Sequence, residues 1–328
     1  MSCNKLMTRA ATLGLAALLS GCAGQGGSMR APGAVVMVPP SVSGSTYSFT
    51  VGETTFTADG PTGRVTGLIF RGRNLLIGSE VNNVTYGSSF WTSPQTWSWP
   101  PAIDAAAWTH RIDTAANRVV FDSGEVSVSG HPLSIQKRFW SDPRRNAVVG
   151  EYTVTNRGSE VLRFAPWQVT RVASEGLVFY PRGAADPAGQ TRRGAPRPIA
   201  AVTVRDGIVW YDFSGNDSQT KSVGDGREGW LAYVANGVLL LQSFVDIPAD
   251  APAEGEAEVE VYTAPNNTLV ELEPQGAAVD LAPGATSAPW RACWYVRAVP
   301  AGMDVSIGSN ALVEWVRSQL PSPAAAAP

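Results

Sequence analysis

Apolar and polar residues alternate with a period of two along most of the chain between residues 45 and 300. The run from Glu256 to Val261 places three carboxylates on one face and three apolar side chains on the other, which is typical of a half-buried antiparallel strand. The same alternation predicts further strands within residues 64–77, 134–140, 148–156, 201–211, 229–245, 267–273 and 290–299. Turn residues separate these strands, as in Asn156-Arg157-Gly158 and Asn236-Gly237.

Helical periodicity is convincing in one segment, from Ser309 to Leu320. Leu312, Val313, Val316 and Leu320 share one helical face, and Ser309 or Asn310 could cap the first turn. The whole pattern predicts an all-β fold, in which residues 45–300 form a single large antiparallel β-sandwich and residues 301–320 add one short C-terminal helix.

The N-terminus has the pattern of a bacterial lipoprotein signal. Lys5 and Arg9 supply positive charge around the start of an apolar stretch that is too short to span a bilayer. The following Leu19-Ser20-Gly21-Cys22 resembles a lipobox, which implies removal of residues 1–21 and acylation of Cys22. The alternative is a plain secretory signal with an incidental cysteine.

Residues near the two ends predict how the domain is attached. Ala23 follows Cys22 where an aspartate would commonly retain a lipoprotein in the inner membrane, so we expect an outer-membrane anchor facing the periplasm. Residues 22–44, which follow the signal, read as a flexible linker, and residues 321–328, mostly Ala and Pro, as a disordered tail. The lipid would be the only membrane attachment, because no other apolar run approaches bilayer length.

Composition narrows the range of partners and cofactors. The 328 residues carry a formal net charge of −3, so the chain lacks the basic character of a nucleic-acid-binding protein. Once the signal is removed and Cys22 is acylated, only Cys293 remains as a free cysteine, which excludes an intramolecular disulfide. Because the two histidines and this cysteine are not clustered, we expect no metal site and no cofactor.

Residues 90–101 are the most informative part of the chain. They place Phe90, Trp91, Trp97 and Trp99 beside three prolines, which predicts a stiff, extended loop that is neither strand nor helix. Rings on a stiff loop lose little conformational entropy on binding, and an indole offers a flat apolar face that suits the C–H face of a sugar. The same rings could instead only close one end of the β-sandwich.

Several segments resemble a known family. Residues 62–76 resemble the early strand of galactose-mutarotase-like proteins. The aromatic loop, residues 165–172, Glu228-Gly229-Trp230 and residues 270–276 resemble DUF4380, a domain family of unknown function within that superfamily. The resemblance covers about residues 45–300 and implies a β-supersandwich, the fold of aldose 1-epimerases.

For an aldose 1-epimerase, the resemblance implies a glutamate general base in a Glu-x-Gln context and a histidine general acid. Glu273-Pro274-Gln275 fits the first pattern, so Glu273 is the candidate catalytic base, and Glu271 is the better candidate for a solvent-facing carboxylate. Residues 164–172, where the acid is expected, contain no histidine. His110 lies near the aromatic loop and could reach the site, whereas His131 is expected in a turn.

The candidate carbohydrate-binding residues combine flat aromatic faces with polar partners: Trp91, Gln95, Trp97, Trp99, Trp167, Arg171, Glu175 and Trp230. The primary hypothesis is an outer-membrane lipoprotein whose domain binds a carbohydrate or glycan in the periplasm. The first alternative is an aldose 1-epimerase-like or other carbohydrate-active enzyme with Glu273 as general base. The second is a non-catalytic envelope assembly or interaction protein, which an exposed aromatic patch would favour.

Overall fold

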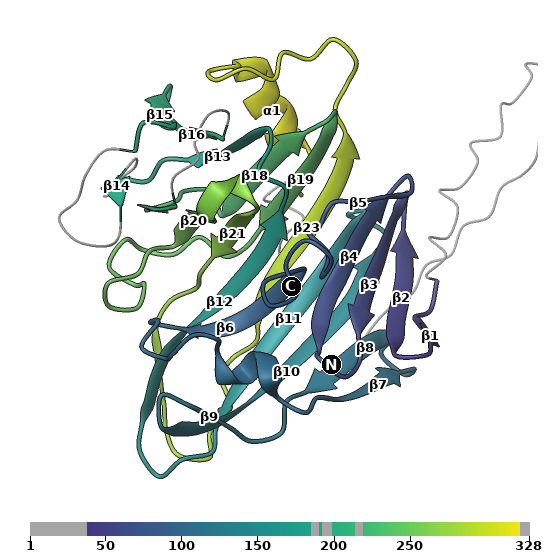
Figure 1. Ribbon diagram of the computed structural model, residues 1–328, viewed down its shortest axis with the longest axis vertical. Coiled ribbons are helices and arrows are strands. Elements are labelled where there is room, and N and C mark those ends of the chain that lie inside the picture. The colour runs from purple at the N-terminus through teal and green to yellow at the C-terminus, as the bar shows by residue number, and fades with distance from the viewer. Residues whose placement is uncertain (1–37, 185–189, 192–198, 214–218, 322–328) are drawn as a thin grey trace, which may run out of the picture. The chain divides into compact units, whose positions relative to one another are not determined.

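The structure, a computed structural model, describes residues 38–184, 190–191, 199–213 and 219–321 (Figure 1). The predicted signal peptide, Cys22, most of the linker and residues 322–328 lie outside the described residues. The described chain forms two large antiparallel sheets and contains one α-helix and two short 3-10 turns, η1 (Ala102–Ala105) and η2 (Pro265–Asn267).

The first sheet has twelve strands and includes part of the aromatic segment. Its main path runs in the order β1 (Ser41–Ser43), β2 (Thr46–Val51), β3 (Thr54–Asp59), β4 (Arg64–Phe70), β6 (Ser88–Ser93), β12 (Leu162–Val172), β21 (Val270–Pro274), β20 (Val259–Thr263), β17 (Thr220–Gly224) and β14 (Gln190–Thr191). Two short strands extend it, β5 (Arg73–Asn74) beside β4 and β22 (Val279–Leu281) beside β12.

The second sheet has eleven strands. Its path runs in the order β15 (Val202–Arg205), β16 (Ile208–Asp212), β13 (Leu177–Pro181), β18 (Trp230–Ala235), β19 (Val238–Ser243), β23 (Trp290–Ala298), β11 (Ala147–Asn156), β10 (His131–Asp142), β8 (Arg118–Asp122) and β7 (Thr109–Asp113), with β9 (Val126–Val128) beside β10. The large and β-branched side chains that gave the alternating pattern fill the space between the two sheets.

The interior between the sheets is mostly apolar but contains a buried polar network. Phe90 of β6 stacks on Tyr152 of β11 with ring centroids 4.3 Å apart, so the two sheets meet there. Gln168 of β12 donates from Nε2 to the hydroxyl of Tyr152 at 2.7 Å and accepts from Nε2 of Gln242 at 2.9 Å. These bonds satisfy polar groups that would be costly to bury alone.

Strand β12 presents different chemistry on its two faces. Gln168 and Thr170 point between the sheets, where both accept from Nε2 of Gln242. Because successive side chains in a strand alternate, Trp167 and Arg171 point to the opposite face of the twelve-stranded sheet. All four side chains are nevertheless fully buried, so residues outside the sheet must cover that second face.

Helix α1 (Asn310–Ser318) packs on the outer face of the eleven-stranded sheet, and Figure 1 shows it above β18 and β19. Leu312, Val313 and Val316 are buried there in a second apolar cluster that includes Trp230. The side chain of Ser309 accepts from the backbone N–H of Leu312 at 3.3 Å, which is the N-cap that the sequence predicts. The helix ends two residues before Leu320.

These features confirm an all-β sandwich with one short C-terminal helix, although several local elements differ from the prediction. Residues 90–93 belong to β6 rather than to an irregular loop, because the prolines begin only at Pro94. Strand β17 was not predicted, and neither were β2, β3, β7, β8 and β13. Within the described ranges, no helix is long and apolar enough to cross a membrane.

Candidate functional site

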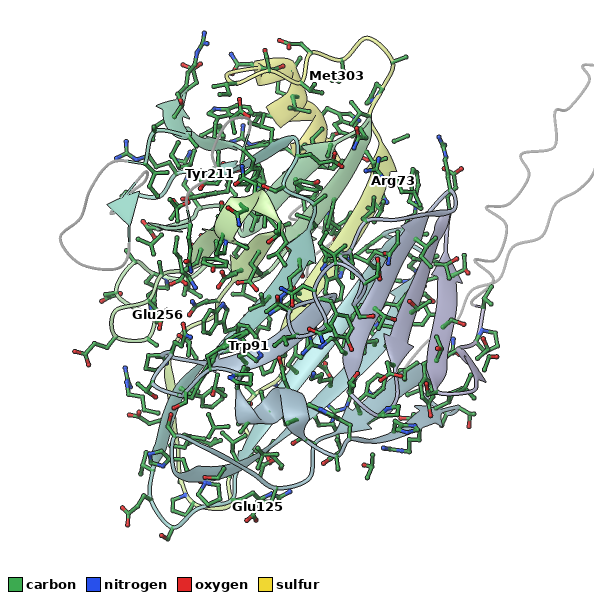
Figure 2. The ribbon with its side chains drawn as sticks, in the orientation of Figure 1. Arg73, Trp91, Glu125, Tyr211, Glu256 and Met303 are labelled. Atoms are coloured by element: carbon green, nitrogen blue, oxygen red, sulfur yellow. The ribbon has the colours of Figure 1, made fainter. Side chains whose placement is uncertain are left out.

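A cavity of about 810 Å³ lies on the face of the twelve-stranded sheet that points away from the second sheet. Residues of β6, β12, β21, β20 and β17 line it, together with loops next to those strands. Figure 2 labels Trp91 of β6 in the middle of the view, with Glu256 on a loop beside it. The cavity is large enough for a small organic ligand.

Tryptophan rings form one side of this cavity, which we call the aromatic wall (Trp91, Gln95, Trp99 and Trp167). Trp91 lies opposite Trp167 on the neighbouring strand, and their rings meet edge to face with centroids 5.3 Å apart. Trp99 meets Trp91 in the same way at 5.8 Å and is 50% exposed. An exposed ring face beside buried rings offers a ligand a pre-ordered stacking surface.

Hydrogen bonds hold the aromatic loop in place. Trp97 is buried against the other tryptophans and donates from Nε1 to the carbonyl oxygen of Thr92 at 2.9 Å. The backbone N–H of Gln95 donates to Oε1 of Glu256 at 2.8 Å, which ties the loop to a distant part of the chain. Trp97 therefore supports the wall and does not offer the stacking face that the sequence predicted for it.

Lys221 lines the cavity beside Trp167 and holds two buried glutamates behind it, and we call the three side chains the charged cluster (Lys221, Glu260 and Glu273). Nζ of Lys221 is 2.7 Å from Oε2 of Glu260 and 2.9 Å from Oε2 of Glu273. The two carboxylates are fully buried and directly opposed on neighbouring strands. Without a cation between them they would repel each other strongly. Lys221 supplies that cation, and its side chain also lines the cavity.

The carboxyl of Glu273 holds a proton more tightly than an ordinary glutamate. Burial raises the pKa of Glu273 to about 8, although the ammonium of Lys221 acts in the opposite direction. Its Oε2 accepts from Nε1 of Trp167 at 2.9 Å, whereas Oε1 has no hydrogen-bond partner among the described residues. Burial lowers the pKa of Lys221, but attraction to Glu260 and Glu273 outweighs burial and raises it overall.

Arg171 holds a second carboxylate at the cavity. Its Nε lies 2.7 Å from Oε1 of Glu271, and its Nη1 donates to Oγ of Ser89 at 3.1 Å. The guanidinium is fully buried and lies 5.1 Å from the ring centroid of Trp91. Glu271, rather than Arg171, lines the cavity. Arg171 therefore positions Glu271, and Glu271 is a buried part of the site instead of the solvent-facing carboxylate that we expected.

Comparison of the sequence with protein families gives one match. Residues 77–297 match the family model described as "Domain of unknown function (DUF4380)". The chain belongs to the DUF4380 family. A search of curated proteins finds no match to it.

Several solved structures have a similar fold. A galactose mutarotase-like protein from Lactobacillus casei has a TM-score of 0.58 at 8% identity and covers 77% of this chain and 100% of its own. A second galactose mutarotase-like protein, from Clostridium acetobutylicum, has a TM-score of 0.52 at 10% identity, covering 77% and 95%. Galactose 1-epimerase from Lactobacillus acidophilus has a TM-score of 0.53 at 12% identity, covering 81% and 98%. These similarities confirm the galactose-mutarotase-like β-supersandwich in this DUF4380 protein.

Two predicted site residues of the DUF4380 domain lie elsewhere. Trp230 belongs to β18 of the eleven-stranded sheet and packs under α1, where its ring meets Phe179 at 5.9 Å. Glu175 lies beyond the end of β12, and its Oε1 accepts from Nη2 of Arg73 at 2.8 Å and from Nδ2 of Asn236 at 2.6 Å. Because the strand stops at Val172, its alternation no longer directs Glu175 toward the cavity.

Neither histidine lies at the cavity. His110 is on β7, at the edge of the second sheet, and its Nδ1 is 2.7 Å from the hydroxyl of Tyr47. His131 is the exposed first residue of β10, and the turn before it consists of Ser129 and Gly130. The structure describes both histidines, and neither of them lines the cavity. The idea that His110 reaches the site is therefore wrong.

The sequence analysis missed the polar side of the cavity, formed by Gln219, Lys221 and Tyr262, and the buried partner Glu260. One signal was available: the chain contains only three lysines, and Lys221 is one of them. A lysine in a short strand of a chain whose cations are mostly arginines indicates a specific partner.

The arrangement offers hydrogen bonds and flat rings, and limited acid–base chemistry. Nε2 of Gln219 donates to the hydroxyl of Tyr262 at 2.6 Å, which leaves hydroxyl and amide groups at the cavity. Glu273 itself does not line the cavity, because Trp167 and Lys221 stand in front of it. Within the described ranges, no three His, Cys, Asp or Glu side chains are grouped to hold a metal ion.

Proposed function

We propose that this protein binds a saccharide in the cavity between the aromatic wall and the charged cluster. The observation that carries the proposal is that Trp91, Trp99 and Trp167 share one cavity with hydrogen-bonding side chains such as Tyr262 and Lys221. A pyranose has an apolar face that suits an indole and a rim of hydroxyl groups that needs donors and acceptors. The similarity in fold to proteins named for galactose supports the same ligand class.

We further propose that the mature protein is anchored to the outer membrane through acylated Cys22 and faces the periplasm. The support is the order of positive residues, apolar stretch and lipobox at the N-terminus. Replacing Cys22 with serine is expected to release the protein from membrane pellets. A Cys22→Ser protein that still sediments with the membrane contradicts this anchoring.

A variant that fills the cavity tests saccharide binding directly. Thr268 lines the cavity and is exposed, so Thr268→Trp is expected to block it without removing a charged partner. Thr203→Trp on the exposed face of β15 is the matched control. The purified full chain is screened on a glycan array, and its hits are measured by calorimetry. The proposal requires hits that Thr268→Trp loses and Thr203→Trp keeps, and an array without hits contradicts it.

Aldose 1-epimerase chemistry with Glu273 as general base is the second candidate. It is favoured by the buried carboxyl of Glu273, whose pKa of about 8 suits proton exchange at neutral pH. Proton NMR of α-galactose with wild type and Glu273→Gln tests it. Interconversion of anomers above the uncatalysed rate that disappears in Glu273→Gln supports catalysis, and an equal rate in both proteins excludes this base.

The assembly-protein alternative receives less support from the aromatic residues. It needs an exposed aromatic patch, but Trp91, Trp97 and Trp167 are buried and only Trp99 of this group is open to solvent. One exposed ring at the mouth of a cavity suits a small ligand better than a protein surface.

A further inference from the structure

We infer that the cavity takes a neutral oligosaccharide of two or more sugar units, with one unit on the aromatic wall and another beside Lys221 and Tyr262. The inference rests on the proposed saccharide binding and adds the length and the charge of the ligand.

The width of the cavity carries the argument for length. Its lining includes Trp91 on β6, Trp167 on β12, Glu271 on β21, Tyr262 on β20 and Lys221 on β17. These are five adjacent strands of one sheet. Four strand spacings amount to about 19 Å, which is several times the width of one pyranose ring. A single sugar unit therefore occupies only part of the floor.

The two ends of the cavity also differ in chemistry. At the β6 end, Trp99 presents a ring that is half exposed, with Trp91 edge-on beside it. At the β17 end, the partners are the amide of Gln219, the hydroxyl of Tyr262 and the ammonium of Lys221. A single sugar ring cannot stack on Trp99 at the β6 end and also form hydrogen bonds at the β17 end. A ligand that uses both ends therefore needs linked sugar units.

The ion pairs at the floor carry the argument for a neutral ligand. Lys221 is the only cation among the described residues that line the cavity, and Glu260 and Glu273 already hold it. Arg171 is buried and paired with Glu271. An acidic sugar would have to compete with the buried Glu260 for Lys221 and would bring a like charge near Glu271.

The protonation of the floor agrees with this reading. A carboxyl with a pKa of about 8 is mostly protonated at neutral pH, so Glu273 adds little negative charge there. The remaining charges then pair off as Lys221 with Glu260 and Arg171 with Glu271. A floor without net charge offers no attraction to a charged glycan and does not exclude hydroxyl groups.

Calorimetry with glycans of graded length tests the inference on the full chain. The probes are galactose, glucose and N-acetylglucosamine, each with its β-1,4-linked oligomers up to the tetrasaccharide, and trigalacturonic acid beside its neutral methyl ester. In at least one neutral series, the dissociation constant is expected to fall by about tenfold or more from one unit to three, a step that is easily resolved. The acid is expected to bind no more tightly than its ester.

The variant Trp99→Ala tests whether the increase in affinity with oligosaccharide length depends on the aromatic wall. The ratio between trisaccharide and monosaccharide affinity is expected to fall toward one in Trp99→Ala. Trp140→Ala is the control, because Trp140 lies on β10 of the second sheet and does not line the cavity. A gain with length that survives in Trp99→Ala overturns the placement of one unit on the wall.

The remaining outcomes separate the inference from the proposed function. If a monosaccharide binds as tightly as its oligomers, or if the acid binds tenfold more tightly than its ester, this inference fails while saccharide binding stands. If none of the probes and no glycan on the array binds, both fail.

Discussion

Trp167 of β12 and Trp230 of β18 are both almost completely buried, yet they have different surroundings. Trp167 lies against two tryptophans and the charged cluster, with Nε1 on Glu273 at 2.9 Å and Lys221 4.6 Å above its ring. Trp230 packs on Phe179 and under the apolar face of α1. Both indole N–H groups donate to a carboxyl, since Nε1 of Trp230 lies 3.2 Å from Oε2 of Glu228. Burial and a carboxyl partner therefore do not separate the wall of a cavity from a core, whereas the ammonium of Lys221 over the ring of Trp167 and the cavity beside that ring do.

Removing Trp230 has the largest expected effect on stability. Trp230→Ala leaves a cavity under α1, and the free energy of unfolding is expected to fall by about 3–5 kcal/mol. Urea unfolding followed by circular dichroism measures this loss. Saccharide affinity of the folded variant should stay at the wild-type value, because Trp230 lies away from the binding cavity. A loss below 1 kcal/mol would show that this tryptophan is not a core residue.

The charged cluster provides the next effect. Lys221→Met leaves Glu260 and Glu273 buried without their cation, so unfolding free energy at neutral pH is expected to fall by about 3 kcal/mol. The loss should be smaller at pH 5 than at pH 7.5, because the carboxyl of Glu273 is then protonated and depends less on the cation. Urea unfolding at pH 5 and pH 7.5 measures the loss of unfolding free energy and its dependence on pH.

Lys137→Met is the matched control for Lys221→Met. Burial lowers the pKa of Lys137 to about 7, and its Nζ donates to the carbonyl oxygen of Gly63 at 3.0 Å. Because this amine is easily neutral, its replacement is expected to cost only about 1 kcal/mol, the value of one hydrogen bond. Equal losses in the two variants would contradict a special role for the charged cluster.

Glu273→Gln should change how stability depends on pH. The pKa of Glu273 is about 8 in the folded protein and near 4.5 when unfolded, so the folded state keeps a proton that the unfolded state releases between these values. Its contribution is complete below pH 4.5 and is lost as pH rises to 8, with a slope of at most about 1.4 kcal/mol per pH unit. Unfolding of Glu273→Gln between pH 5 and pH 8 should lack this slope.

Glu53→Gln is the control for that slope. Glu53 is exposed and bonded to Arg71, which lowers its pKa, so its contribution is lost only as pH falls below the window. Wild type and Glu53→Gln should therefore show parallel curves. A Glu273→Gln curve that is also parallel to wild type would mean that Glu273 is ionised throughout.

Trp99→Ala has the smallest expected effect on stability. Its ring is half exposed and meets Trp91 on one side, so unfolding free energy should fall by less than about 1 kcal/mol. Thermal unfolding measures this change, beside the large loss in Trp230→Ala. A loss as large as that of Trp230→Ala would assign Trp99 to the core and remove the stacking surface.

The sequence predicts the fold well because alternation and turn residues are local signals. It also predicts that Trp91, Gln95, Trp99 and Trp167 come together, since the resemblance and the aromatic loop both point to them. It fails for Trp230, because alternation shows which residues share a face of a strand but not which of two sheets the strand joins.

The glutamates Glu258 and Glu260 show a second limit of predicting burial from sequence alternation. The run from Glu256 to Val261 has the pattern of a strand with one wet face, yet Glu258 and Glu260 are fully buried. The polar face of a strand can border either solvent or a cavity that other residues cover. Which of the two it borders depends on loops far away in the sequence. The partner that makes burial of Glu260 tolerable is Lys221, 39 residues earlier in the numbering.

The register of strand β12 determines both the cavity and the contact between the two sheets. Trp167 and Arg171 serve the cavity, while Gln168 and Thr170 serve the contact between the sheets. Inserting one residue early in this strand would turn each set toward the other's environment, placing an arginine among apolar rings and an amide where an indole belongs. The length of β12 is therefore constrained from both sides.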